Sequence, residues 1–249
     1  MVESRKVYLV TGANRPNGIG LSLVSKLSSR QNTLVFATAR DPSRATELQA
    51  LAKERGNIVV LKLEVPSEED AKAAAAAVAE KAGKLDVLIA NAGYFEAGFL
   101  LDQSIEGLRK SWEINALGPA ILFKAFASLL FKSQQPVFMP ISTAAASMGL
   151  NWPMPTAAYG SSKAALNFLT QNAHHAHEKE KLTAFTIHPG MVDTSMAEEA
   201  IPALGMSKEQ AKPISVDEST NGILGVVDEA SRESHGGKFY SYDKSQLPW

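Results

Sequence analysis

The sequence of 249 residues contains no cysteine. Disulfide bonds, thiolate metal sites and cysteine nucleophiles are therefore excluded, and the composition fits a reducing compartment. No uninterrupted apolar run reaches the roughly 18 residues of a membrane span, and Val7–Val10 is too short for the core of a signal peptide. These absences predict a cytoplasmic protein that does not enter a membrane.

The sequence also has no excess of positive or negative side chains. Lysine and arginine total 25, aspartate and glutamate total 26, and the net charge is −1, so no broad attraction to nucleic acid is expected. His174, His175 and His177 form the one histidine cluster, but no carboxylate–histidine spacing typical of a metal site accompanies them. We expect a polar helix face there, no bound metal, and a small molecule as the partner.

Short apolar runs alternate with longer helical patterns from one end of the chain to the other. The expected strands are Val7–Val10, Thr33–Thr38, Ile58–Lys62, Val87–Ala90, Val137–Ile141, Ala184–His188 and Lys238–Tyr240. The expected helices are Ile19–Ser29, Glu68–Lys81, Leu108–Leu130 and Ser161–Lys179. Most strands are apolar on both faces, as in a parallel sheet covered on each side.

This alternation predicts an α/β protein with a single-domain Rossmann fold over residues 1–249. Its doubly wound parallel sheet would have about seven strands, with helices on both faces. The segment 194–215 contains methionines, prolines and a glycine, and we expect it to form a lid over an apolar substrate.

A glycine-rich turn follows the first expected strand and opens the first helix. It runs from Thr11-Gly12 through Asn14 and Arg15 to Gly18-Ile19-Gly20. Glycines let the backbone approach a pyrophosphate, and the helix start offers N–H groups to it. The alternative is an ordinary strand-to-helix turn, but its position at the first of many strand–helix units favours dinucleotide binding.

Two arginines refine the choice of dinucleotide. Proteins that prefer NAD usually end the second strand in a carboxylate that binds the ribose diol. Here Arg40 follows Thr38-Ala39, with Arg15 in the glycine turn and Asp41 one position after Arg40. A guanidinium fits a 2′-phosphate through charge-assisted bonds. We therefore expect NADP(H), the alternative being two solvated surface arginines.

Tyr159 and Lys163 place a phenol and an ammonium four residues apart, on one face of a helix. A neighbouring cation favours the phenolate, which predicts a lowered pKa for Tyr159 and proton exchange near neutral pH. A phenol aimed at a carbonyl oxygen can supply its proton. Upstream, the hydroxyls of Ser142 and Thr143 end a strand and would hold the substrate oxygen, or else serve as ordinary turn hydroxyls.

Six motifs occur together in one order along the chain. They are Thr11-Gly12 to Gly18-Ile19-Gly20, Asp86 with Asn91-Ala92-Gly93, Asn115, Ser142-Thr143, Tyr159 to Lys163, and Pro189-Gly190 with Thr194. In this combination the chain resembles the classical short-chain dehydrogenases/reductases over essentially its full length. The ending Leu247-Pro248-Trp249 is similar to fungal carbonyl reductases of the norsolorinic-acid-ketoreductase type.

The resemblance implies the role of each site residue. Tyr159 would be the acid/base, Lys163 would lower its pKa and bind the nicotinamide ribose, Thr143 (with Ser142 as the fallback) would hold the substrate, and Asn115 would hold a water. The implied cofactor-binding residues are Gly12, Asn14, Arg15, Gly18, Ile19, Gly20, Arg40, Glu64, Val65, Asn91, Ala92, Gly93, Tyr159, Lys163, Pro189, Gly190, Val192 and Thr194.

Three positions depart from the family pattern. Pro16-Asn17 lengthens the glycine turn by two residues, and the proline removes one N–H donor. Thr143 stands where the family usually has a serine, and Glu64 stands where it usually has an aspartate. From the residues alone, Asn115 is also compatible with a satisfied buried amide, and Asn91-Ala92-Gly93 with a plain turn.

The sequence thus predicts an NADPH-dependent oxidoreductase that reduces a ketone or aldehyde, with a role in secondary metabolism. A family member with non-redox chemistry (cyclase, lyase or epimerase) and a dinucleotide-sensing binding protein are the alternatives. The intact Tyr159/Lys163 pair argues against both. The resemblance also implies a homodimer or homotetramer packed through the helices Leu108–Leu130 and Ser161–Lys179.

Overall fold

The computed structural model describes residues 5–150 and 152–249. The strands are β1 Lys6–Val10, β2 Thr33–Ala39, β3 Ile58–Lys62, β4 Val87–Ala90, β5 Val137–Pro140, β6 Thr183–Ala184, β7 Thr186–His188, β8 Phe239–Ser241 and β9 Gln246–Leu247. The α-helices are α1 Ile19–Ser28, α2 Thr46–Arg55, α3 Glu68–Ala82, α4 Ile105–Trp112, α5 Gly118–Leu130, α6 Ala157–Ala176, α7 Ser195–Ala203, α8 Lys208–Ala211, α9 Val216–Glu229 and α10 Arg232–His235. Short turns η1 Pro42–Arg44, η2 Glu113–Leu117 and η3 Ala144–Ala146 complete the elements.

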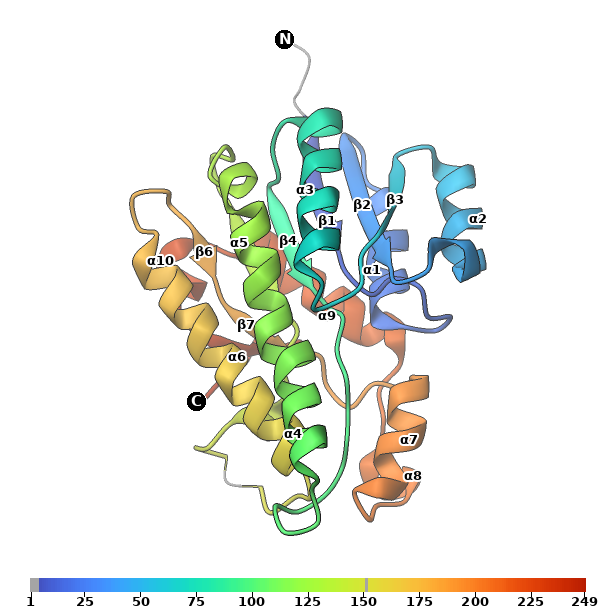
Figure 1. The fold of residues 1–249 in the computed structure, drawn as a ribbon, viewed down its shortest axis with the longest axis vertical. Coiled ribbons are helices and arrows are strands. Elements are labelled where there is room, and N and C mark those ends of the chain that lie inside the picture. Colours follow the sequence, from blue (N-terminus) through green and yellow to red (C-terminus); the bar gives the residue numbers. More distant parts are fainter. Residues whose placement is uncertain (1–4, 151) are drawn as a thin grey trace.

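Six strands form a parallel sheet in the order β3-β2-β1-β4-β5-β6, with helices on both faces (Figure 1). The expected strand Ala184–His188 is interrupted at Phe185, so β6 pairs with β5 whereas β7 pairs with β8. A parallel bridge between Ile141 and Ile187 joins the two sheets. The doubly wound Rossmann architecture is confirmed, with β9 antiparallel to β8 beside it.

Each face of the sheet buries its own apolar layer. On one face the strands contact α1, α2 and α9 through residues such as Val24, Leu48 and Ile223. On the other face α3 and α5 contribute Val78 and Phe126. Strand residues alternate between these layers, which explains why the strands are apolar throughout rather than at every second position.

The third helix shows how local sequence sets an element's ends. Ser67 accepts a hydrogen bond from the Asp70 amide at 3.1 Å, and acidic residues occupy the first turn. The helix ends at Gly83, whose φ of 73° lies in the left-handed region. The helix therefore begins at Glu68, as the sequence predicts, and its last residue lies one position after the expected Lys81.

The expected helix Leu108–Leu130 begins earlier and contains a π turn. It consists of α4, η2 and α5 in direct succession. Among the described residues, this run (Ile105–Leu130) is long and apolar enough to cross a membrane by length and composition. Core helices of soluble proteins have the same character, and Leu122, Phe126 and Leu130 lie in the buried layer over the sheet.

Two further differences concern the site. The helix expected from Ser161 begins at Ala157, so that Tyr159 lies in its first turn. The segment 194–215, expected as a lid, contains α7 and α8, which Figure 1 shows set apart from the helices covering the sheet.

Asp86 fastens the amino edge of the sheet. Its carboxylate accepts hydrogen bonds from the Val7 amide at 2.8 Å and from the Ser133 hydroxyl at 2.5 Å, and it pairs with Lys84 at 2.9 Å. The residue precedes β4 and is 5% exposed. Its contacts link β1, β4 and the segment before β5, at the edge opposite the residues described next.

Candidate active site

The predicted site residues gather where the parallel strands end. The glycine turn follows β1, Arg40 follows β2, Asn91 follows β4 and Thr143 follows β5. In doubly wound sheets this carboxyl edge is where ligands bind, between strands that run to opposite sides. The topology therefore assembles most of the motifs that the sequence shows separately.

The glycine turn is tightly packed against the Asn91 turn. Gly12 has φ +68°, and a Cβ at Gly20 would lie 2.6 Å from both Asn91 Nδ2 and the Gly12 oxygen. Thr11 Oγ1 accepts hydrogen bonds from the Asn91 and Ala92 amides, each at 3.0 Å, and Asn91 Nδ2 donates to the Thr11 oxygen at 2.8 Å. Asn91-Ala92-Gly93 is thus a brace for the first turn, and only glycine fits at position 20.

The two extra residues of the turn form a self-contained bend on the surface. Asn17 has φ 51°, and the Gly18 amide donates to the Arg15 oxygen at 3.1 Å. Proline at the second place and a left-handed asparagine at the third are typical of a type II turn. No side chain caps the start of α1 at Gly18, so the first N–H groups of the helix stay available to an anion.

Arg40 is exposed directly after β2, and Arg15 and Asn14 are exposed in the turn. Within the described residues neither guanidinium has an ion-pair or hydrogen-bond partner. Asp41, the carboxylate next to Arg40, caps η1 and accepts hydrogen bonds from the Ser43 amide at 3.0 Å and the Ser43 hydroxyl at 2.6 Å. These bonds lower its pKa. The cationic side of the turn is therefore left to Arg15 and Arg40.

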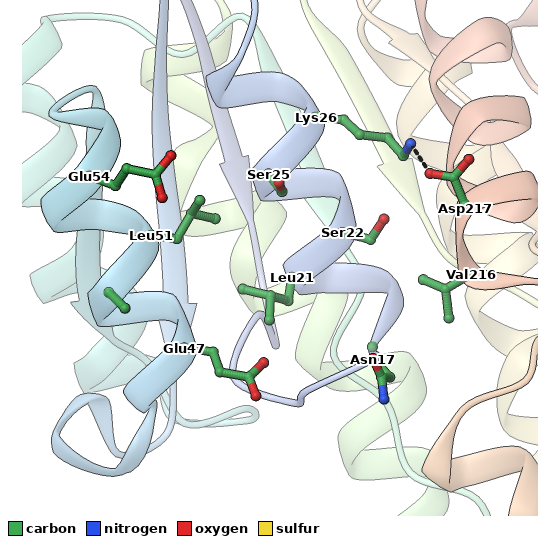
Figure 2. A pocket seen from close by; sticks show the side chains of 12 residues that line it. Asn17, Leu21, Ser22, Ser25, Lys26, Glu47, Leu51, Glu54, Val216 and Asp217 are labelled. Carbon is green, nitrogen blue, oxygen red and sulfur yellow. Dashed lines mark hydrogen bonds and ion pairs between the residues drawn. The ribbon is translucent and has the colours of Figure 1, made fainter.

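A surface groove lies between α1, α2 and α9 on the outer side of the turn (Figure 2). Asn17 and Gly18 are at its end, and Lys26 forms an ion pair with Asp217 across it. None of the predicted catalytic residues lines this groove, so it is separate from the chemistry considered below.

The catalytic candidates meet at the start of α6. The Thr143 hydroxyl lies close enough to the Tyr159 hydroxyl to favour its ionised form and so lower its pKa. Phe95, two residues after Gly93, holds the Tyr159 ring edge-to-face with ring centroids 5.1 Å apart. Thr143 also caps η3, where it accepts from the Ala145 amide at 3.3 Å. The structure thus places Thr143 beside the phenol.

Ser142 points away from that cluster. It is 1% exposed, and its hydroxyl donates to Asn167 Oδ1 at 2.7 Å inside the protein. Adjacent residues of an extended strand face opposite sides, which accounts for the separation of Ser142 from Thr143. The substrate-holding role therefore suits Thr143, whereas Ser142 connects β5 to α6.

Lys163 is buried at 3% exposure, one helical turn after Tyr159, and its Nζ donates to the Ile141 oxygen at 2.6 Å. A Cβ at Gly93 would lie 3.7 Å from that Nζ. Burial lowers the pKa of Lys163 to about 7. A cation so poorly solvated gains strongly from any anionic or hydroxyl-rich ligand that enters beside it.

The expected lowering of the Tyr159 pKa is not what the structure shows. Burial raises the pKa of Tyr159 to about 12, although the Thr143 hydrogen bond lowers it. Desolvation opposes the phenolate more strongly than the neighbouring groups favour it. Tyr159 is therefore a neutral phenol at physiological pH, in the protonation state of a proton donor.

Asn115 lies at the centre of the π turn η2 and is fully buried. Its Oδ1 accepts from the Tyr94 amide at 2.8 Å, and its Nδ2 donates to the Tyr94 oxygen at 2.8 Å and to Ser162 Oγ at 3.0 Å. The satisfied-amide interpretation therefore describes this side chain, which ties the Gly93 loop to α6. π turns are frequent at functional sites.

The stretch from Pro189 to Thr194 leaves β7 as a strap. Gly190 has φ +85°, and a Cβ there would lie 2.7 Å from Ile214 Cδ1. Val192 forms a parallel bridge with Ile214, and Thr194 caps α7 by accepting from the Ala197 amide at 3.4 Å. The strap therefore connects the sheet edge to α7.

Glu64 and Val65 follow β3 at the far side of the edge. The Glu64 amide donates to Asp70 at 2.9 Å, and its side chain is exposed. Val65 closely approaches Gly118, where a Cβ would lie 2.1 Å from Val65 Cγ1. The two residues border the site without touching the Tyr159 cluster.

Sequence reasoning missed several contributors. Phe95 packs against the Tyr159 ring, Ser162 accepts a hydrogen bond from Asn115, and the Ile141 oxygen accepts one from Lys163. Phe95 and Ser162 lie within five residues of predicted positions, so their neighbourhood was a signal. The Ile141 oxygen gave no such signal, because it is a main-chain atom that lies 22 positions from Lys163 in the sequence.

These features define the class of a dinucleotide-dependent Rossmann oxidoreductase with a tyrosine–lysine pair. The family model described as short chain dehydrogenase matches residues 6–205. The chain belongs to the short-chain dehydrogenase family, as the motifs indicated.

Relatives in this family match the chain over nearly its full length. Norsolorinic acid ketoreductase of Aspergillus parasiticus is 37% identical over 98% of this chain and 91% of its own length. An uncharacterized oxidoreductase of Schizosaccharomyces pombe is 37% identical over the whole of both chains. The crystal structure of NADPH-bound carbonyl reductase from chicken fatty liver has a TM-score of 0.88 and 33% identity, covering 99% of this chain and 100% of that one.

Proposed function

We propose that the protein is an NADPH-dependent carbonyl reductase that converts a ketone or aldehyde to the alcohol. The observation that carries the proposal is the cluster of a neutral Tyr159 hydroxyl, the Thr143 hydroxyl and the buried Lys163 ammonium beside the glycine turn. Norsolorinic acid ketoreductase and the NADPH-bound chicken enzyme support the substrate class and the coenzyme. A role in secondary metabolism belongs to the same proposal.

The residues present fit NADP(H). Gly12 and Gly20 let the turn pack tightly against Asn91 and Ala92, where a Cβ would clash, and the uncapped start of α1 leaves N–H groups available to a phosphate. Arg15 and Arg40 would hold the 2′-phosphate, and Lys163 the nicotinamide ribose. Val192 and Thr194 of the strap would contact the nicotinamide end. When bound, the coenzyme supplies a hydride to the carbonyl carbon.

The chain's own residues supply the proton and the alignment. Thr143 binds the carbonyl oxygen and Tyr159 donates its phenolic proton to that oxygen as negative charge develops there. The Lys163 ammonium stabilises the phenolate that remains, until the phenol is protonated again. Lys163 is buried, and Thr143 and Tyr159 are partly buried, so water has limited access to the three groups.

Three further properties belong to the same proposal. The segment 194–215 acts as a lid. Backbone hydrogen bonds join Met191 and Asp193 to Ile214 at its base, so that α7 and α8 form one projecting segment. The chain forms a homodimer or homotetramer through α4, α5 and α6, which expose Trp112 and Phe168. The protein acts in the cytoplasm.

Coenzyme choice gives the first test. Wild-type protein is expected to oxidise NADPH, and NADH far less well, when assayed by nicotinamide absorbance with a panel of aromatic and aliphatic ketones. Arg40→Asp is expected to weaken the affinity for NADPH by about 10- to 100-fold relative to NADH. The substitution would replace a charge-assisted contact with the 2′-phosphate by repulsion between two negative charges. Arg55→Asp, an exposed arginine at the end of α2, is the matched control.

Two results would contradict the proposal. Binding of NADPH without turnover of any carbonyl would favour a non-redox enzyme or a dinucleotide sensor. An unchanged NADPH-to-NADH ratio in Arg40→Asp would show that the phosphate is held elsewhere.

A further inference from the structure

The end of the chain contacts the loop that carries Thr143. We define the tail as Gln246–Trp249 and the cleft loop as residues 144–150. The Gly149 amide donates to the main-chain oxygen of Trp249 at 2.7 Å, and Ser147 Oγ donates to the Pro248 oxygen at 2.7 Å. Ser147 and Pro248 are 101 positions apart in the sequence, so this is a tertiary contact rather than a local turn.

The tail is itself anchored to the sheet. Its first residues form β9, antiparallel to β8 in the register Phe239↔Leu247. The Trp249 ring stacks on the fully buried Phe239 with centroids 5.9 Å apart and an interplanar angle of 17°. Because stacked aromatic pairs contribute beyond their buried area, the ring fixes the tail oxygens that the cleft loop uses.

The contact fits closely at Gly149. A Cβ at this position would lie 2.9 Å from Pro248 Cβ and 3.1 Å from the Trp249 oxygen. Ser147 Oγ also accepts from the Leu150 amide at 3.1 Å. The Ser147 hydroxyl therefore connects the tail, through the Pro248 oxygen, to the bend between Ser147 and Leu150.

The cleft loop leads directly to the reacting groups. The Ser147 amide donates to the Ala144 oxygen and the Ala146 amide to the Thr143 oxygen, both at 3.0 Å. On its other side the loop touches the start of α6, where a Cβ at Gly160 would lie 2.8 Å from the Ala145 oxygen. The turn η3 is thus held between the tail and the residue after Tyr159.

We infer that Trp249 and Ser147 are positioning residues for the carbonyl reduction. The Trp249–Phe239 stack holds the tail, the tail holds Ser147 and Gly149, and these hold η3 so that the Thr143 hydroxyl meets the Tyr159 hydroxyl. This inference rests on the proposed function for its kinetic consequence, but the contact itself is testable without turnover.

The kinetic test compares Trp249→Ala, Trp249→Phe and Ser147→Ala with the wild type. Trp249→Ala is expected to lower kcat by about 10-fold, because displacing an aligning hydroxyl by a fraction of an ångström has effects of this order. NADPH affinity, measured by fluorescence, stays within about 2-fold because the glycine turn is untouched. Trp249→Phe keeps a stacked ring and restores most of kcat. Met148→Ala, in the same loop but 82% exposed, is the matched control and keeps the wild-type kcat.

A double-mutant cycle separates positioning from general destabilisation. If the tail acts through Thr143, adding Trp249→Ala to Thr143→Ala causes no further loss of kcat, since coupled residues are non-additive. A second full 10-fold loss in the Thr143→Ala background would overturn the inference, as would an unchanged kcat in both Trp249→Ala and Ser147→Ala.

Amide hydrogen exchange tests the contact independently of activity. In Trp249→Ala the amides of Gly149, Leu150 and Ala145 are expected to exchange faster, while those of β1 keep their protection. If wild-type protein reduces no carbonyl, the proposed function fails, and the exchange result still decides whether the tail orders the loop. Unchanged exchange at Gly149 would overturn the inference even in an active enzyme.

Discussion

Replacing Tyr159 by phenylalanine is expected to lower kcat for ketone reduction by about 10²- to 10⁴-fold, the usual contribution of a positioned acid. The structure identifies the reason. Burial raises the pKa of Tyr159 to about 12, so the group is a neutral donor at physiological pH, and its hydroxyl is aligned by Thr143 and its ring by Phe95. The change removes one oxygen atom and leaves the ring contact intact.

The measurement is a steady-state assay with saturating NADPH, accompanied by the coenzyme dissociation constant. We expect NADPH affinity to change little in Tyr159→Phe, because the glycine turn and Arg40 are unaltered. Tyr240→Phe, whose hydroxyl donates to the Ser234 oxygen at 2.8 Å on the exposed surface, is the control. Full activity in Tyr159→Phe would show that the proton comes from another group.

Replacing Lys163 by methionine is expected to abolish most activity and yet stabilise the coenzyme-free protein. Burial depresses the pKa of Lys163 from 10.5 to about 7. The unfolded chain therefore binds the proton more tightly than the folded protein does. The free energy of unfolding of the wild type therefore rises with pH between about 7 and 10.5. Below pH 7 the folded protein bears the full cost of burying the charged ammonium.

Methionine has no proton to lose, so the difference in stability between Lys163→Met and wild type depends on pH. The part that comes from ionisation is expected to be largest, on the order of a few kcal/mol in favour of Lys163→Met, below about pH 7, and to vanish near pH 10.5. Loss of the hydrogen bond to the Ile141 oxygen offsets it by about 1 kcal/mol at every pH. Urea unfolding at several pH values measures this, with exposed Lys179→Met as the control. A difference that does not vary with pH would contradict the assignment.

Local signals in the sequence were sufficient for the sheet and for most of the site. The strands were recognisable because both faces are buried, and α3 because Ser67 and the acidic first turn mark its start. The glycine turn and Tyr159/Lys163 were recognisable because each needs a particular residue type at a fixed spacing. Thr143, rather than Ser142, lies beside the phenol, as the resemblance implied by giving the role to the second of the two hydroxyl residues.

What the sequence did not reveal depends on packing between distant segments. The pKa of Tyr159 was predicted from the nearest charge, whereas the degree of burial decides its direction, and burial is a property of the assembled cleft. The break at Phe185 and the partners of Asn115 likewise follow from tertiary contacts. Helix α2 was missed because its ten residues bury only Leu48 and show little amphipathic pattern.

The carboxylate of Asp86 draws three segments together at the rim of the sheet farthest from the reacting groups. These stabilising contacts and the proposed catalytic cluster thus lie at opposite edges of one sheet. Because distant sites contribute almost independently, substitutions around Lys84 and Ser133 are expected to change stability with little effect on turnover.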